Sequence, residues 1–158
     1  VSKTSNWLIG GRVLEDRKSD ETFALLNNNY LVKRWNNKNS QANIYLLSSV
    51  GLNTENSESM ATVGIHGDWE NRQFMVMEML EYYSYNNAWV SNTRVAYSPF
   101  KVDYSKTSAW FIAHYRVEYH NDSYSYMFFP VVRLFKKNYL FELGSNGKNS
   151  FLSFMTHF

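Results

Sequence analysis

Period-two alternation of side chains is the feature that most constrains what this chain can fold into. It is clearest over residues 108–119, SAWFIAHYRVEY. One set of alternate positions is uncharged throughout: Ala109, Phe111, Ala113, Tyr115, Val117 and Tyr119. The other set includes His114, Arg116 and Glu118. A β-strand puts these two sets on opposite faces, whereas a helix would spread both around its circumference. The segment is therefore predicted to be a strand.

Similar alternation recurs along the whole chain and predicts an all-β fold. Ten such segments lie at 6–14, 22–34, 41–52, 59–67, 72–82, 93–102, 108–119, 124–135, 139–145 and 149–158. The segment 22–34 also allows a short helix, and Pro99 interrupts 93–102. The connectors are short and rich in Asn, Asp and Ser, which favour turns. We predict one domain, 1–158, folded as an up-and-down antiparallel meander of about ten strands (8–12).

Such a meander removes its exposed edges most simply by closing into a barrel. A membrane barrel turns an apolar band toward lipid, between two belts of aromatic side chains. Aromatic residues make up 18% of this chain. They gather near one predicted rim at Tyr82, Tyr83, Tyr85, Trp89, Tyr119, Tyr124 and Tyr126, and near the other at Trp35, Trp69, Tyr104, Tyr139 and Phe158. This distribution favours a closed, transmembrane β-barrel.

The last ten residues, NSFLSFMTHF, carry a second signal for the same class. Phe158, Phe154 and Leu152 occupy alternate positions and end on an aromatic residue. This pattern resembles the C-terminal signature of Gram-negative outer-membrane β-barrel proteins. The resemblance implies an assembly signal that the barrel-assembly machinery reads, and a last strand that closes the barrel against the first. It also implies a bacterial outer-membrane location, with the lipid bilayer as partner and an export signal already removed.

Charged residues inside such a barrel need partners. If KKNY turns the chain after residue 135, the hairpin register places Arg133 opposite Glu142. Arg116 and Glu118 share an inward face nearby, and Glu78 and Arg12 are further candidates. We predict an interior ionic network that plugs the lumen. The alternative is the selectivity ring of a small pore.

The histidines suggest two further sites. In GIHGDWE, the residues His66, Asp68 and Glu70 alternate along one face and are a candidate divalent-cation site. An ordinary polar turn explains the same residues, and we favour that interpretation. His120 in the loop HNDS, together with His114, is a candidate for a catalytic site at the rim. No motif of a nucleophile, base and orienting residue accompanies either histidine, and we expect no cofactor.

Composition narrows the functional classes. Lys and Arg number 16 against 14 Asp and Glu, without a basic run, which argues against nucleic-acid binding. We favour a small outer-membrane barrel without evident catalysis, in a structural, partner-binding or narrow-channel role. Another membrane protein or a periplasmic protein is a candidate partner. Two alternatives stay open: a lipid-modifying outer-membrane hydrolase or acyltransferase, and a soluble calycin-like barrel that binds an apolar small molecule.

Overall fold

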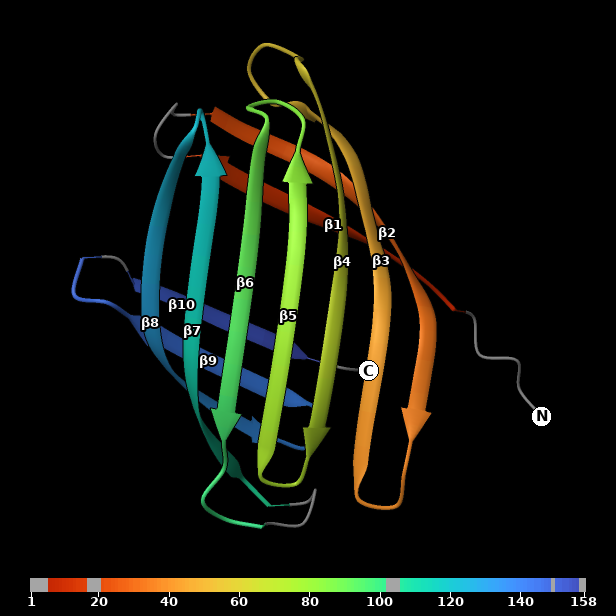
Figure 1. Cartoon of the computed structure of the whole chain (residues 1–158), viewed down its shortest axis with the longest axis vertical. Helices are drawn as coiled ribbons and strands as arrows, with labels where there is room; N and C mark the ends of the chain where they lie inside the picture. The colour runs from red at the N-terminus through yellow and green to blue at the C-terminus, as the bar shows by residue number, and fades with distance from the viewer. Residues whose placement is uncertain (1–5, 17–20, 102–105, 149, 157–158) are drawn as a thin grey trace.

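The alternating segments form ten antiparallel strands in a computed structural model that describes residues 6–16, 21–101, 106–148 and 150–156. The strands are β1 (Trp7–Asp16), β2 (Glu21–Asn36), β3 (Ser40–Asn53), β4 (Ser59–Asn71), β5 (Phe74–Tyr83), β6 (Ala88–Tyr97), β7 (Ser108–His120), β8 (Ser123–Lys136), β9 (Tyr139–Ser145) and β10 (Ser150–Thr156). Each strand pairs with the next to make one sheet, shown in Figure 1. The predicted all-β class and strand order are confirmed. Over the described ranges, no helix is long and apolar enough to cross a membrane.

The segment 22–34, which also allowed a short helix, is a strand as the alternation predicted. The predicted bounds of the sixth segment are wrong. The sixth strand begins at Ala88 rather than at residue 93, because Ala88 and Val90 are buried while Trp89 between them is exposed. The alternation thus starts inside the stretch predicted as a connector. The strand ends at Tyr97, two residues before Pro99, which cannot donate to a ladder.

The sheet curls without closing, so the predicted closed barrel is not what the described residues form. In Figure 1, both ends of the sheet, β1–β2 and β9–β10, lie behind the strands in front. Among the described residues β1 pairs only with β2, and β10 only with β9. β9 and β10 have seven residues each, whereas β2 has 16. The sheet is therefore short at its β10 edge, and few backbone groups of β10 can form a ladder with β1.

Two glycines lie where neighbouring strands approach too closely for a side chain. A Cβ at Gly51 of β3 would be 2.0 Å from the backbone oxygen of Ala24 in β2. A Cβ at Gly64 of β4 would be 2.4 Å from the backbone oxygen of Leu80 in β5. Both positions belong to the concave face, where strong curvature crowds neighbouring strands. The missing methyl groups therefore allow the curl.

Candidate functional site

The concave face holds the buried side chains, and many of them are polar. Two apolar clusters lie there, one containing Phe23, Leu25, Met60, Tyr83, Ala88 and Val90, the other Met75, Ala96, Ile112, Phe129 and Val131. The buried polar side chains include Asn43, Ser49, Asn53, Thr62, Glu81, Asn92 and Glu142. The concave face is therefore mixed in character, and its charged groups need partners within it.

The convex face has the opposite character. Its strand centres expose large apolar side chains, among them Ile9, Val13, Leu26, Leu46, Val50, Val63, Ile65, Val76, Val95, Phe128 and Val132. A sheet in water normally turns polar residues to solvent and apolar residues to its core. Exposed apolar surfaces of this kind are typical of faces that contact a membrane, another protein or a ligand.

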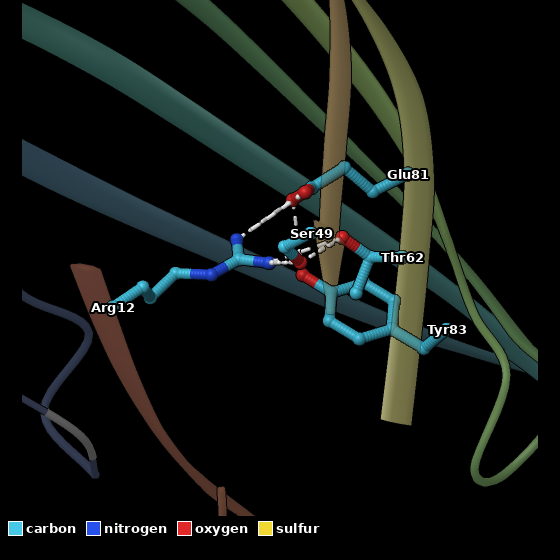
Figure 2. Close-up of polar contacts among 5 residues, drawn as sticks. All are labelled: Arg12, Ser49, Thr62, Glu81 and Tyr83. Atoms are coloured by element: carbon cyan, nitrogen blue, oxygen red, sulfur yellow. Dashed lines mark hydrogen bonds and ion pairs between the residues drawn. The ribbon is translucent and has the colours of Figure 1, made fainter. Parts of the chain in front are cut away.

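One ionic cluster joins β1 to strands that are not its neighbours. Arg12 Nη1 of β1 donates to both carboxylate oxygens of Glu81 in β5, at 3.2 and 3.3 Å. Its Nη2 donates to Ser49 Oγ of β3 and Thr62 Oγ1 of β4, each at 3.4 Å. Tyr83 completes the cluster by donating its hydroxyl to Glu81 at 3.0 Å. Figure 2 shows the Arg12 side chain reaching from its strand to these partners, so the cluster fixes the curl.

We expect Arg12→Gln to detach β1 and to lower the free energy of unfolding by about 2–3 kcal/mol. Glu81 is 3% exposed, so the substitution leaves its carboxylate buried without its cation. Amide hydrogen exchange in mild detergent measures the effect, and β1 amides should exchange faster than those of β7. Arg72→Gln, at an exposed position just after β4, is the matched control. Unchanged exchange of β1 in Arg12→Gln contradicts the role of this cluster.

A second cluster centres on Glu142 of β9. Arg133 of β8 lies opposite it in the ladder and donates from Nε to its Oε1 at 2.6 Å. Arg94 of β6 donates from Nη1 to both oxygens of the same carboxylate, at 3.4 and 3.3 Å. Arg133 Nη1 also lies 3.6 Å from the sulfur of Met75 in β5. Two guanidinium groups thus share one carboxylate that is 5% exposed.

The other predicted members of the ionic network do not join either cluster. Arg116 and Glu118 stay on the concave face and pair with each other, with 3.5 Å between Nη2 and Oε2. Glu78 was predicted to point inward, and this is wrong. It is exposed on the convex face with Val76 and Leu80, because Met75 and Glu81 take the buried positions of β5.

Only some residues of the predicted aromatic belts lie on the convex face. Trp35, Trp69, Tyr124 and Tyr126 are exposed on the convex face near strand ends, and the Tyr119 ring packs 4.9 Å from that of Tyr124. Tyr83 and Tyr85 do not belong to a convex belt. Tyr83 is 6% exposed and bonds Glu81, while Tyr85 packs on Phe23 at 4.7 Å in an apolar cluster.

The predicted assembly signal is described only in part. Leu152 and Phe154 of β10 are exposed on the convex face. Their positions two residues apart put them on one side of the strand, as the sequence pattern requires. Phe158 lies outside the described residues, as does Tyr104 of the predicted belt.

The candidate metal site is part of a polar row across β2, β3 and β4. Arg34 Nε donates to Asn43 Oδ1, and Asn43 Nδ2 donates to Asp68 Oδ1, both at 2.7 Å. His66 Nε2 lies 3.5 Å from Asp68 Oδ2. In the part of the chain that the structure describes, no group of three or more His, Asp or Glu side chains, including Glu70, is arranged to hold a metal ion. The Asp68 carboxylate is oriented by its hydrogen bond from the Asn43 amide.

The two candidate catalytic histidines lie apart and have amide partners. His114 of β7 is on the concave face, with Nε2 3.2 Å from Asn92 Oδ1. His120 ends β7, and its Nε2 is 2.7 Å from the Asn121 amide nitrogen in the turn. Neither arrangement supplies a nucleophile with a base and an orienting carboxylate. The geometry therefore gives no support to the hydrolase alternative.

A cavity of about 650 Å³ opens at the rim where β2, β4, β6 and β8 end. Its lining is polar and aromatic and includes Glu70, Arg72, Trp110 and Arg133. Arg133 is held by Glu142, so the second ionic cluster lies at the inner boundary of this cavity.

Sequence reasoning missed Arg94 and Glu81, and it missed Arg34 and Asn43, which join Asp68 in the polar row. Arg94 could have been found from the sequence. When the strand is started at Ala88, Arg94 falls on the same face as Ala88, Val90 and Asn92. Glu81 had no comparable signal, because its partner Arg12 is 69 residues away. No family model, no curated protein and no solved structure matches this chain.

Proposed function

We propose that this protein is a small integral β-barrel of a bacterial outer membrane, without catalytic activity, whose interior is plugged by ion pairs. The observation that carries the proposal is the reversed polarity of the sheet. Glu81 and Glu142 are paired with arginines on the concave face, while the strand centres on the convex face are apolar. Lipid-facing apolar and interior polar side chains alternate in this way in membrane barrels.

The proposal includes closure of the sheet in the bilayer. An open edge in hydrocarbon leaves backbone N–H and C=O groups without hydrogen-bond partners, which costs several kcal/mol for each group. β1 and β10 are the two free edges among the described strands. Pairing them antiparallel removes both edges, and this is the closure that the C-terminal resemblance implies.

The interior favours a structural or partner-binding role over a channel. The guanidinium of Arg12 spans from β1 to β5, and the carboxylate of Glu142 binds arginines of β6 and β8. These side chains, together with the apolar cluster around Phe129, lie on the face that would line a pore, which supports a filled interior over an open one. A narrow barrel filled by its own side chains is the expected result.

Gel migration of unboiled and boiled protein, prepared with and without mild detergent, tests the proposal. We expect a folded band that resists SDS, shifts on boiling and requires detergent during preparation. A water-soluble monomer without a heat shift contradicts membrane insertion. That result would favour the soluble alternative, with Met127, Phe129 and Val131 as part of its apolar interior.

A further inference from the structure

A carboxyl group lies in the middle of the apolar convex face. Glu78 of β5 is four residues from Phe74 and five from Tyr83, the two ends of the strand. Its neighbours on this face of β5, Val76 and Leu80, are exposed. At roughly 3.3 Å per residue, Glu78 is on the order of 13 Å along the strand from the nearer end. If the barrel spans a bilayer, this depth is hydrocarbon, where an ionisable side chain needs a partner.

Two hydroxyl groups of β6 hold the Glu78 carboxylate in place. Ser91 Oγ donates to Oε1 at 2.6 Å, and the Thr93 hydroxyl donates to Oε2. Thr93 lies directly opposite Glu78 in the ladder. A carboxylate can accept about four hydrogen bonds, so each oxygen retains accepting capacity. The hydroxyl groups orient the carboxylate but are neutral, and its charge is not compensated by them.

The other flank of Glu78 is open. Gly67 of β4 lies opposite Glu78 on that side, and a Cβ built on it would meet nothing within 4 Å. The position beside the carboxylate therefore carries no side chain, and a side chain from outside can approach it there. Unlike Gly51 and Gly64, this glycine is not required by close approach of a neighbouring strand.

We propose that Glu78, Ser91, Thr93 and Gly67 form a lateral docking site for a membrane-embedded segment of another protein that carries a Lys or Arg side chain at mid-depth. The proposal rests on the membrane location proposed above. A cation compensates the negative charge of the Glu78 carboxylate, which the two neutral hydroxyl groups do not. The attraction between two opposite charges is strong in a low-dielectric medium. Lipid headgroups lie at the rims and do not reach this depth.

A second copy of this chain does not meet the requirement. Within the described residues, the strands present Lys33 and Lys136 on the convex face. Lys33 is three residues from the end of β2 and lies over the Trp35 ring at 5.0 Å, and Lys136 is the last residue of β8. Lys33 lies in the same ladder row as Glu78, through Ile44 and Gly67, but its ammonium is turned to Trp35, the last residue but one of β2. Both lysines therefore have their ammonium groups toward the rim, and the cation is assigned to a different protein.

The test uses the full chain in phosphatidylcholine vesicles with two labelled synthetic transmembrane helices. One is Leu-rich with a single central Lys, and the other has Leu at that position. Fluorescence energy transfer is expected to show that the protein binds the Lys peptide at least about tenfold more tightly than the Leu peptide. Glu78→Gln should abolish this preference. Gly67→Leu places a side chain beside the carboxylate and should reduce the preference while leaving Glu78 intact.

Equal binding of both peptides by the unmodified protein, or an unchanged preference in Glu78→Gln, overturns the docking site. Heat-modifiable gel migration is measured on each vesicle sample before binding. Failure of the unmodified protein to insert overturns the proposed function and the docking site together. Insertion without a preference for the Lys peptide overturns the docking site alone.

Discussion

Glu142→Gln is expected to lower the free energy of unfolding by about 3–5 kcal/mol, the cost of breaking a buried ion pair by removing one partner. Glu142 accepts hydrogen bonds from Arg133 and Arg94, and each guanidinium is largely withdrawn from solvent. The amide keeps the size of the side chain but removes its charge. Two cations then remain close together with no carboxylate between them.

Urea unfolding followed by tryptophan fluorescence, in the medium that keeps the unmodified protein folded, measures this effect. Glu58→Gln is the matched control, because Glu58 is exposed just before β4 and should change stability by less than about 0.5 kcal/mol. Adding Arg94→Gln to Glu142→Gln should recover part of the loss by removing one unpaired cation. If Glu142→Gln is as stable as the control Glu58→Gln, the assigned role of Glu142 is contradicted.

Gly51→Ala is expected to cost at least about 3 kcal/mol or to prevent folding, at the upper end of the usual range for overpacking. The added methyl carbon would lie 2.0 Å from the oxygen of Ala24 and 2.8 Å from the Cα of Leu25. These are backbone atoms of the paired strand, so relief requires β2 and β3 to separate. Such a movement also disturbs the apolar cluster that contains Leu25.

Gly67→Ala is the matched control for this substitution. It adds the same methyl group to a strand of the same sheet, where nothing lies within 4 Å. Its effect on the urea midpoint should be small, since the loss of backbone freedom in the unfolded chain offsets other changes. If the two variants unfold at the same urea concentration, close approach at Gly51 does not limit the curl.

Local pattern was sufficient to predict the strands and one of the ion pairs. Alternation identified ten segments because a strand separates odd and even positions. Arg133 and Glu142 could be placed opposite each other because a two-residue turn links β8 to β9 and fixes their register. Both inferences use residues close together in the chain.

Local pattern could not predict which face of a strand is concave, nor how strongly the sheet bends. In β5 both alternate sets are mainly apolar, with Met75, Met77 and Met79 against Val76 and Leu80, so the pattern did not show which side Glu78 takes. The contact between Arg12 and Glu81 depends on how far three intervening strands bend. Strand periodicity does not determine that bend.

The span of the Arg12–Glu81 contact has a consequence for the order of folding. Each ladder joins strands that follow one another in sequence, so hairpins need only short loops to close. The pairs Arg12–Glu81 and Arg94–Glu142 join residues 69 and 48 positions apart. Ordering such long loops is entropically costly and is repaid only once the intervening strands are in place. The ionic interior is therefore a late product of folding, formed after the hairpins and completed by the curling of the whole sheet.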